Sequence, residues 1–393
     1  MSEGNKPIVL IVHNHYQIPG GEDTVVANEK KLLENHGHKV ILYTRDNKEL
    51  KTMGKMRKLF LPFTTIYNPR TSREVKRIIK DQKIDIVHVH NTLNLISPSV
   101  YYASRKCGVP VVQTIHNFRF LCPSAIFYRD GHICEDCVSK GLTCAIKHSC
   151  YRGSKVQTII CVISTKLHRL TGIYKKINYI TLTEFNKSKL LLLKQIKEER
   201  VFVKPNFSFS KNEKQIKKEV KDYYLYIGRI EEIKGVDILL NAFSKMPEKK
   251  LYLAGEGPLF IEKKKWAENY QNISFLGFLD KENIYKYISG AKAVILPSQV
   301  YEGFPMTITE AFSLSTPMIV SNIGNTGSLV EDGITGIKFQ YNSEDALIEA
   351  VDRIESLDII SMGKKAYEKY VSEYSSEENY KKLMQIYNLV MKG

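Results

Sequence analysis

Short apolar runs alternate with amphipathic stretches along the whole chain. Continuous apolar runs of this kind are typical of parallel strands that are buried on both faces. In the first half they predict strands at Ile8–His13, Lys39–Tyr43, Ile84–His90 and Val109–His116. Helical patterns predict helices at residues 24–36 and 72–82, and a further helix is expected between the last two of these strands.

The second half repeats this design. Apolar runs predict strands at Asp222–Gly228, Lys250–Ala254, Ile273–Leu276, Ala293–Leu296 and Pro317–Val320. Apolar residues at helical spacing predict a helix at Val236–Met246, and two last helices are expected at Ser356–Tyr370 and Ser376–Lys392. Strands that alternate with helices in this way are the signature of a doubly wound α/β sheet.

The chain is therefore expected to form two Rossmann-like α/β domains that face each other across a cleft. Its 393 residues favour two domains over one. We take the polar, proline-containing segment Lys204–Asn212 as the linker. This gives a first domain over 1–205, a second over 206–375, and a C-terminal helix over 376–393 that packs back on the first. Ligands of open α/β sheets bind at the carboxyl ends of the strands, so the site is expected at the cleft.

Composition narrows the class of protein. Hydrophobic residues make up 43% of the chain and charged residues 25%, as in ordinary soluble proteins. No apolar run approaches the length of a membrane span, and the N-terminus has no signal-peptide pattern, so we expect a cytoplasmic protein. Seven cysteines, an odd number, argue against a complete disulfide framework.

The net charge of +16 is confined to one half of the chain. Residues 1–200 hold 33 Lys and Arg against 16 Asp and Glu, a net charge of +17. Residues 201–393 hold 25 against 26, a net charge of −1. A basic half predicts a polyanionic partner, either nucleic acid or an anionic membrane surface.

The most informative stretch is Ser298–Phe312, which places Glu302 in a loop and Glu310 in the helix that follows. Pro305 suits the start of a helix. The helix predicted over Met306–Ser313 would direct free N–H groups at the loop, an arrangement that binds phosphate. Two carboxylates around such a helix start suit the hydroxyl groups of a sugar nucleotide. Solvated glutamates on an ordinary loop and helix are the alternative.

A second polar cluster follows the strand predicted at Asp222–Gly228. Arg229 comes directly after this strand, and Lys234 stands just before the next helix. At the mouth of the cleft these side chains would neutralise a diphosphate, Arg by bidentate contact and Lys as a point charge. A helix-capping loop with incidental charges is the alternative, and the two glutamates downstream favour the diphosphate.

With these motifs the chain resembles the retaining glycosyltransferases of family 4, group 1, which have the GT-B fold. The resemblance is carried by Gly228-Arg229-x4-Lys234-Gly235, by Gly255-Glu-Gly-Pro258, and by Glu302-Gly-Phe-Pro305 with Glu310 eight residues after Glu302. It implies that Arg229 and Lys234 bind the donor phosphates and stabilise the departing diphosphate. Glu310 would hold the ribose, and Glu302 the hydroxyl groups of the transferred sugar.

The same resemblance implies further donor contacts. They come from Gly20, Gly21, Gly255, Leu276, Gly303, Phe304, Pro305 and Met306. Gly20 and Gly21 match a loop that closes over donor and acceptor, where glycine permits close backbone approach and positive φ. Leu276 lies in the segment that frames the nucleobase. His116, at the end of its strand, matches an active-site histidine that hydrogen-bonds the donor sugar, with a plain strand-end histidine as the alternative.

The implied reaction is a retaining transfer in which His116, Glu302, Arg229 and Lys234 are the catalytic residues. The leaving diphosphate is stabilised by cationic side chains and a helix N-terminus, so no cofactor or divalent metal is required. The acceptor hydroxyl attacks the face that the leaving group vacates. The first half offers no obvious nucleophilic carboxylate beyond Glu22, so no covalent glycosyl-enzyme is expected. His88 and His90 are interpreted as sheet-face histidines, although His90 lies near a strand end and within reach of acceptor.

Five of the seven cysteines lie close together in a loop over residues 120–154. Cys134 and Cys137 form a C-x2-C pair, and this spacing with two further thiols is typical of zinc ligands. The ligands we expect for a structural zinc are Cys122, Cys134, Cys137 and Cys150, with Cys144 or His148 as substitutes. Free buried thiols in a reducing compartment are the alternative. Since the loop follows His116, we expect it on the acceptor side of the cleft, as in a subset of polysaccharide-assembly glycosyltransferases that it resembles.

Two basic stretches of the first half suggest contact with a membrane. Lys51–Phe63 joins four positive charges to an apolar tip, and Lys155–Lys176 mixes Lys and Arg with Ile, Val and Leu. Both fit attachment to an anionic bilayer. For the second stretch, an internal helix with one basic face is an equally good interpretation.

The sequence therefore predicts a retaining glycosyltransferase that uses a nucleotide-sugar donor of the UDP-sugar kind. The acceptor is expected to be a lipid-linked or membrane-held glycan, bound by the first domain, in the assembly of capsule or exopolysaccharide. The protein would be peripheral at the inner face of the cell membrane and bind no nucleic acid.

Two other classes of protein fit the sequence less well. A basic nucleic-acid- or membrane-binding α/β protein without transferase activity would leave Arg229, Lys234 and the two glutamates unexplained. A nicotinamide oxidoreductase would need G-x-G-x-x-G after a first strand, and neither half has it.

Overall fold

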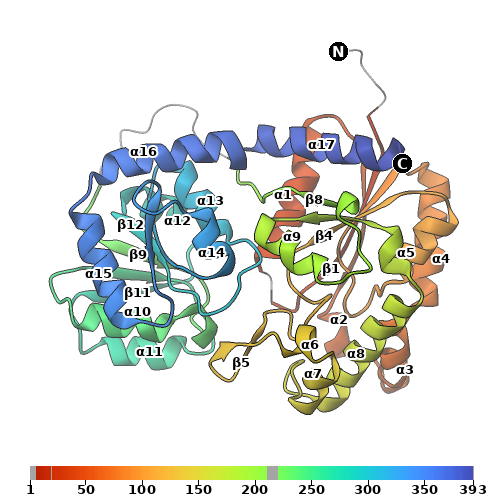
Figure 1. Ribbon diagram of the computed structural model, residues 1–393, viewed down its shortest axis with the longest axis horizontal. Helices are drawn as coiled ribbons and strands as arrows, with labels where there is room; N and C mark the ends of the chain where they lie inside the picture. The colour runs from red at the N-terminus through yellow and green to blue at the C-terminus, as the bar shows by residue number, and fades with distance from the viewer. Residues whose placement is uncertain (1–5, 19, 210–219, 393) are drawn as a thin grey trace. The chain divides into compact units, whose positions relative to one another are not determined.

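The computed structural model of the protein describes residues 6–18, 20–209 and 220–392 (Figure 1). The chain divides into two compact units. The first contains the residues up to Arg129, Cys134–Pro205 and the residues from Asn379 on, and the second contains Asp130–Ile133 and Asn206–Glu378. The expected linker straddles the boundary at Pro205, and its last residues, 210–212, lie outside the described residues.

A parallel six-stranded sheet forms the centre of the first unit, in the order β2-β1-β3-β4-β7-β8. Its strands are β1 (Val9–His15), β2 (Val40–Asp46), β3 (Ile86–Asn91), β4 (Val111–Ile115), β7 (Asn178–Thr181) and β8 (Val201–Val203). The apolar run Val9–Val12 is fully buried in β1, as expected for a strand covered on both faces. Strands β7 and β8, with four and three residues, were not predicted from the sequence.

Two helices from opposite ends of the sequence share one hydrophobic core with this sheet. They are α1 (Gly21–Asn35) and α17 (Ser376–Lys392). Val26 and Leu33 of α1 and Leu383 and Tyr387 of α17 pack with strand residues in this core. Other helices of the first unit are α2 (Glu49–Thr52), α3 (Lys55–Ile66), α4 (Pro69–Gln82), α5 (Ser99–Lys106), α6 (Asp136–Ser139), α7 (Thr143–Lys147), α8 (Lys155–Leu170) and α9 (Glu184–Leu191).

The second unit also has a parallel six-stranded sheet, in the order β11-β10-β9-β12-β13-β14. Its strands are β9 (Tyr224–Ile227), β10 (Leu251–Ala254), β11 (Ile273–Gly277), β12 (Ala293–Leu296), β13 (Met318–Ser321) and β14 (Gly336–Phe339). Its helices are α10 (Val236–Ser244), α11 (Phe260–Ala267), α12 (Lys281–Gly290), α13 (Met306–Ser313), α14 (Gly324–Leu329), α15 (Glu344–Glu355) and α16 (Ile359–Lys369).

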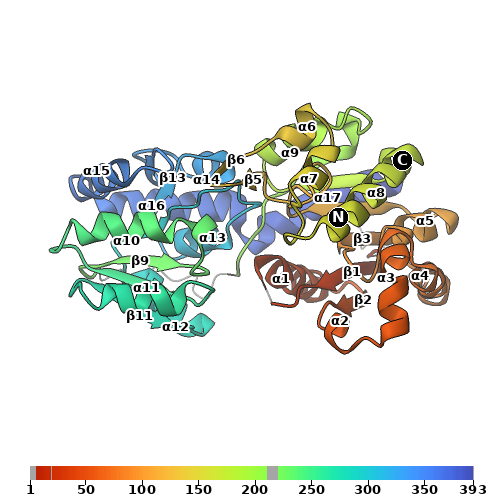
Figure 2. The same cartoon turned by 90° about the horizontal axis from the view of Figure 1, so that it is seen from below.

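Helices cover both faces of the second sheet (Figure 2). The main core is formed by the sheet with α10, α11 and α15, and includes Leu240, Phe243 and Leu347. Helix α13 packs between α12 and α16 instead. The predicted doubly wound α/β class is thus confirmed in each unit. No helix in the described parts of the chain is both long and apolar enough to cross a bilayer.

Each sheet has a point at which the strand order reverses. In the first unit it lies between β1 and β3, and in the second between β9 and β12. Crevices at the carboxyl ends of strands at such a point are where open α/β sheets bind ligands. The residues that follow these four strands are therefore the place to look for a site in each unit.

Candidate active site

The predicted diphosphate-binding residues lie at the reversal point of the second sheet. Arg229 follows β9 directly, and Lys234 ends a short 3-10 helix, Glu232–Lys234, that precedes α10. Glu302 lies in the loop between β12 and α13. Since β9 and β12 are hydrogen-bonded neighbours, residues far apart in the sequence meet at one edge of the sheet.

A glycine fixes the loop that carries Lys234. Gly235 has φ +72°, and a Cβ at this position would lie 1.9 Å from the carbonyl oxygen of Pro297. The amide of Gln299 donates to the carbonyl of Ile233 at 2.9 Å, which ties the same two loops together. Only glycine permits both this φ and this backbone contact. The close approach holds Lys234 beside the loop that carries Glu302.

Lys234 and Glu302 form an ion pair. Nζ of Lys234 lies 2.7 Å from Oε1 of Glu302, and the hydroxyl of Ser298 donates to the same oxygen at 2.6 Å. Burial alone would raise the pKa of Glu302, but the charge of Lys234 and these hydrogen bonds hold it below its ordinary value. Glu302 is therefore an ionised acceptor, and the sequence alone did not predict that Lys234 would be its partner. Arg229, which is 48% exposed at its side chain, lies 3.5 Å from Glu231.

The backbone of the Glu302 loop is anchored by a buried amide. Nδ2 of Asn325, in α14, donates to the carbonyls of Glu302 and Gly303 at 2.5 and 2.7 Å. Pro305 is the residue that caps α13, with Met306 as its first helical residue. The unpaired N–H groups of this first turn form an anion-binding end. Asn325 was not predicted, because nothing in its local sequence marks it as an anchor.

Glu310 lies one turn into α13, and its carboxyl group accepts no hydrogen bond from the residues that the structure describes. Burial raises its pKa to about 7, partly offset by the charge of Lys281. Binding of a diol would give the carboxyl group of Glu310 a hydrogen-bond partner. Gly255 has φ +137°, and a Cβ there would lie 1.9 Å from the carbonyl of Gly228, so packing alone requires glycine. Leu276 lies near the end of β11 and is partly exposed.

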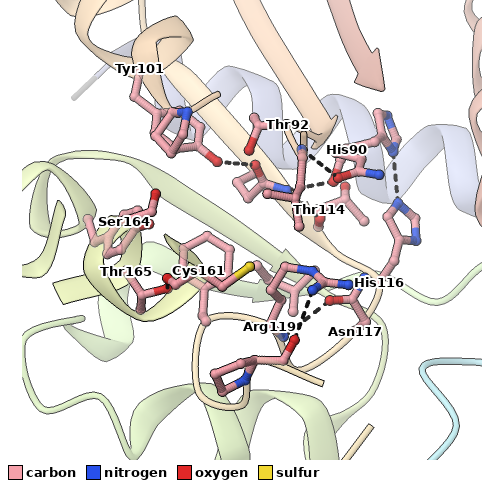
Figure 3. Close-up of a pocket in the computed structure, with 18 residues that line it drawn as sticks. His90, Thr92, Tyr101, Thr114, His116, Asn117, Arg119, Cys161, Ser164 and Thr165 are labelled. Carbon is pink, nitrogen blue, oxygen red and sulfur yellow. Dashed lines mark hydrogen bonds between the residues drawn. The ribbon is translucent and has the colours of Figure 1, made fainter. Parts of the chain in front are cut away.

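In the first unit, His116 follows β4 and contacts His90 at the end of β3. Nε2 of His116 lies 2.9 Å from Nδ1 of His90, and the two rings are stacked (Figure 3). Nε2 of His90 lies 3.3 Å from Oε1 of Glu29, a residue of α1 with no exposed surface. A buried chain of three titratable groups thus leads from α1 to His116.

The charges along this chain determine which histidine nitrogen carries a proton. Burial alone would raise the pKa of Glu29, but His88 and Lys204 hold it well below its ordinary value, so Glu29 is ionised. Burial and the neighbouring His88 lower the pKa of His90 to about 4, so this ring is neutral at pH 7. Its proton belongs on Nε2, facing the carboxylate. Nδ1 of His90 then accepts from Nε2–H of His116, which leaves Nδ1 of His116 as an acceptor.

His116 also lines a cavity of about 80 Å³. Asn117, Arg119 and Cys161 contribute to the same cavity, as Figure 3 shows. Nη1 of Arg119 donates to the carbonyl of Pro123 at 2.9 Å. Polar and cationic groups therefore line part of the cavity beside the histidine, together with apolar ones such as Ile115 and Phe120.

The loop at Gly20 and Gly21 is built differently from our expectation. Gly20 has φ −139°, so it does not use the positive φ that glycine permits, and a Cβ there would meet no atom within 4 Å. Gly21 is the first residue of α1. The amide of Gly20 donates to Asp23 at 2.9 Å, and Asp23 also contacts Nε2 of His13 at 2.9 Å. The carboxylate of Asp23, rather than backbone freedom, fixes this loop.

Glu22 is buried beside the same loop. Burial raises its pKa to about 8, against a hydrogen bond from Tyr16 that lowers it. The hydroxyl of Tyr16 donates to Oε2 of Glu22 at 2.8 Å. Glu22 is thus largely protonated at pH 7.

The cysteine loop brings some of its thiols together. Cys122 is buried, and its thiol hydrogen-bonds that of Cys137 and lies 3.1 Å from the hydroxyl of Ser124. Cys137 and Cys150 pack against one small apolar cluster. Within the described chain, three-ligand groups with donor atoms within 4.8 Å are His13, His15 and Asp23, and Glu29, His88 and His90, with no cysteine group among them. In the second group the amine of Lys204 lies 3.0 Å from Glu29, so a cationic side chain already pairs with this carboxylate.

Two family models match the chain. Residues 208–377 match glycosyl transferases group 1, and residues 19–132 match glycosyltransferase family 4. The Gly20 loop and His116 lie within the second match, and Arg229, Lys234, Glu302 and Glu310 lie within the first. The chain is a glycosyltransferase similar to those of group 1 and family 4.

Relatives and solved structures agree with this class. The chain is 23% identical over 401 residues to the UDP-Gal:alpha-D-GlcNAc-diphosphoundecaprenol alpha-1,3-galactosyltransferase of Escherichia coli, with 93% of each chain covered. It is 26% identical over 246 residues to the O-antigen biosynthesis glycosyltransferase WbnH of Escherichia coli, covering 61% of this chain and 68% of the relative. HepE of Anabaena, solved in complex with UDP, superposes with a TM-score of 0.68 at 15% identity, over 97% of this chain and all of the other. The predicted GT-B fold is confirmed.

Proposed function

We propose that the protein is a retaining glycosyltransferase that moves a sugar from a nucleotide-diphosphate donor to a hydroxyl group of a lipid-linked glycan. The observation that carries this proposal is the ion pair of Lys234 and Glu302 beside the start of α13, at the strand-order reversal of the second sheet. There a cation and a helix N-terminus meet the charge of a diphosphate. Glu302 meets a polyhydroxyl group as an ionised acceptor.

The roles of the individual residues follow from their contacts. Arg229 and Lys234 neutralise the departing diphosphate, so the proposed reaction needs no divalent metal. Glu310, whose carboxyl group accepts no hydrogen bond from the described residues, accepts from the ribose. His116 hydrogen-bonds the transferred sugar through Nδ1, the nitrogen that His90 leaves unprotonated. Gly303, Phe304 and Met306 supply backbone around the donor.

The comparisons support a donor and a pathway for this proposal. HepE binds UDP, and the galactosyltransferase relative uses UDP-Gal with a diphosphoundecaprenol acceptor. WbnH acts in O-antigen biosynthesis. We therefore propose a UDP-sugar as donor and cell-surface polysaccharide assembly, such as capsule or exopolysaccharide, as the process.

A membrane-facing surface in the first unit fits a lipid-linked acceptor. Helix α3 exposes Met56, Leu59, Phe60 and Phe63, of which Phe63 is 69% exposed. Lys51, Lys55, Arg57 and Lys58 lie in and before the same helix. Helix α8 packs against α3 and exposes Val156, Ile163, Leu167 and Leu170. Apolar side chains among basic ones bind anionic bilayers, so we place the enzyme at the inner face of the cell membrane.

The test of the proposed function is release of nucleoside diphosphate from UDP-, GDP- and TDP-sugars in the presence of membrane extract. We expect turnover with one donor, a product that keeps the anomeric configuration by NMR, and a loss of at least about 100-fold in Lys234→Ala. Lys364→Ala, at an exposed position of α16, is the matched control and should keep full activity. Inversion at the anomeric carbon, or full activity in Lys234→Ala, would contradict the proposal.

A further inference from the structure

We propose that Arg119 and Arg152 form a binding site for the phosphate groups of an amphiphilic acceptor, in which a diphosphate joins a sugar to an aliphatic chain. This inference rests on the proposed function and deepens it, because it assigns the part of the first unit that recognises the acceptor carrier. It is carried by two arginines that form no ion pair with the described residues, one aromatic ring and three adjoining cavities.

The two arginines converge on one side chain. The guanidinium carbon of Arg119 lies 5.1 Å from the ring centre of Tyr151, and that of Arg152 lies 5.4 Å from it. Tyr151 is buried, whereas Arg152 is exposed. Both guanidinium groups therefore carry their positive charges against the same ring.

No acidic side chain offsets this charge within the described parts of the chain. Neither arginine takes part in an ion pair there, and the side chain of Arg119 donates to the carbonyl of Pro123. The carboxyl group of Glu22 interacts with Arg119, and burial raises its pKa to about 8, so it is largely neutral at pH 7. A phosphate ligand would supply the anionic partner that both arginines lack among the described residues. Guanidinium groups bind phosphate in bidentate geometry.

A cavity of about 280 Å³ lies between these groups. Tyr16, Asn47, Asn91 and Ser124 add donors and acceptors to its lining, which also includes Leu93 and Cys150. This volume compares with about 30 Å³ for one water molecule in the liquid, so the cavity has room for a diphosphate and its immediate substituents.

The linings of the two neighbouring cavities indicate which chemical groups fit at each end of the ligand. One of about 340 Å³ shares Tyr151 and Arg152 with the arginine cavity and is lined by Leu61, Pro62 and Ile160. It borders α3, whose exposed Phe60 and Phe63 belong to the membrane-facing surface. An aliphatic chain fits this end.

The other neighbouring cavity is the one beside His116. It shares Asn91, Leu93 and Arg119 with the arginine cavity. A sugar attached to the diphosphate would therefore lie next to His116, and the aliphatic chain would run toward α3. The apolar surface, the two arginines and the histidine thus follow one another in the same order as the lipid, the diphosphate and the sugar of the proposed ligand.

The experiment is calorimetric titration of the full chain with farnesyl diphosphate, inorganic pyrophosphate and farnesol. We expect farnesyl diphosphate to bind, and Arg152→Gln to weaken it about tenfold, the value of one charge-assisted hydrogen bond. Arg119→Gln should weaken it at least as much. Arg105→Gln, an exposed arginine at the end of α5, is the matched control and should bind as the wild type does.

Because Arg152 is exposed, its replacement leaves the fold intact, and an unchanged melting temperature checks this. Pyrophosphate and farnesol should each bind at least about tenfold more weakly than farnesyl diphosphate, since each lacks half of the ligand. Absence of farnesyl diphosphate binding, an affinity insensitive to both arginines, or pyrophosphate binding as tight as farnesyl diphosphate would overturn the inference.

The donor site is kept separate by repeating the titration with Lys234→Ala, which should bind farnesyl diphosphate normally. Loss of binding in Lys234→Ala would place the ligand at the donor site and overturn the inference. Binding through the arginines with no turnover of any nucleotide sugar would contradict the proposed function and leave the phosphate site standing. Once a lipid acceptor is turned over, Arg152→Gln should raise its KM and leave the KM of the donor unchanged.

Discussion

Nε2 of His116 lies 2.9 Å from Nδ1 of His90, and with the proton of His90 on Nε2 this contact leaves the lone pair of His116 on Nδ1. The contact depends on Glu29, which lies on the far side of His90 and is itself held by Lys204. A residue of α1, buried under the sheet, therefore controls the hydrogen-bonding state of the candidate catalytic histidine.

We predict that His90→Asn lowers kcat for sugar transfer more than it raises the KM of the donor. The nitrogen shifts of His116 should report an Nε2–H tautomer in the wild type and a mixture in the variant. His132→Asn, at an exposed position, serves as control and should change neither. A single, unchanged tautomer of His116 in His90→Asn would contradict the role of His90.

The buried groups Glu29, His90 and His116 predict that the protein loses stability on acidification. The pKa of His90 is about 4 in the folded protein, below the 6.5 of a free histidine, because burial and His88 oppose its charge. The unfolded state therefore binds more protons between these values, so the free energy of unfolding falls as the pH drops from 6.5 toward 4. Urea titrations at pH 7.5 and 5 should show a smaller decrease for His90→Asn than for the wild type.

The ionisation of Glu310 is expected to lower the free energy of unfolding as the pH rises, which is the opposite of the effect of His90. Burial raises the pKa of Glu310 to about 7, so ionising it costs stability as the pH rises from its unfolded value through 7. Glu310→Gln should therefore gain melting temperature relative to the wild type at pH 8 but not at pH 5. In the same range, UDP affinity of the wild type should rise with pH, since the ionised carboxylate accepts more strongly from ribose, whereas that of Glu310→Gln should stay flat.

Two glycines offer a matched pair of substitutions. Gly235→Ala should destabilise the protein by about 2 kcal/mol or more, because the new Cβ meets the carbonyl of Pro297 at an unfavourable φ. Gly20→Ala, at an extended and open position, should leave the melting temperature within about 2 °C of the wild type. Equal melting temperatures for the two variants would show that the Gly235 contact is not tight.

The cysteine loop predicts a structural zinc that holds Cys122, Cys134, Cys137 and Cys150. Purified protein should contain about one zinc per chain, and chelation should lower its melting temperature, since metal binding stabilises the folded state. Cys137→Ser should lose the metal, whereas Cys107→Ser, outside the loop, should keep it. Metal-free protein with an unchanged melting temperature would identify these residues as free thiols.

The membrane-facing surface predicts binding to anionic vesicles. In sedimentation with phosphatidylglycerol-containing vesicles, Phe63→Ser should bind severalfold less than the wild type, because a side chain that is 69% exposed loses its apolar contact with the bilayer. Ile261→Ser, which removes an apolar side chain that is 83% exposed in the second unit, should bind as the wild type does. Equal binding to neutral vesicles would contradict the basic part of the surface.

Continuous apolar runs made the central strands of both sheets predictable, because strands such as β1 and β12 are buried on both faces and consist mainly of apolar residues. Helix α13 was predicted with its observed ends, because Pro305 marks the start of the helix. Strand β8, with three residues, has no such pattern and owes its conformation to its neighbour β7.

The candidate site was only partly predictable for a related reason. Residue types and spacing pointed to Lys234 and Glu302, but their ion pair joins positions 68 apart and depends on the pairing of β9 with β12. Glu29 and Asn325 carry no local signal, because their importance comes from what folding places beside them. Gly20 was predicted by resemblance. It does not use positive φ, one of the two reasons we gave, and close approach of its backbone to a ligand stays a prediction.

The last helix of the chain has a consequence for biosynthesis. Asn379 and Tyr387 of α17 bind Lys204 and His88, both deep in the first unit, and Leu383 and Val390 fill its core. A ribosome delivers these residues only after the whole second unit has emerged. The core of the nascent first unit therefore stays incomplete until α17 has been made, and removal of the last turn of α17 is expected to leave the first unit a chaperone substrate rather than a folded domain.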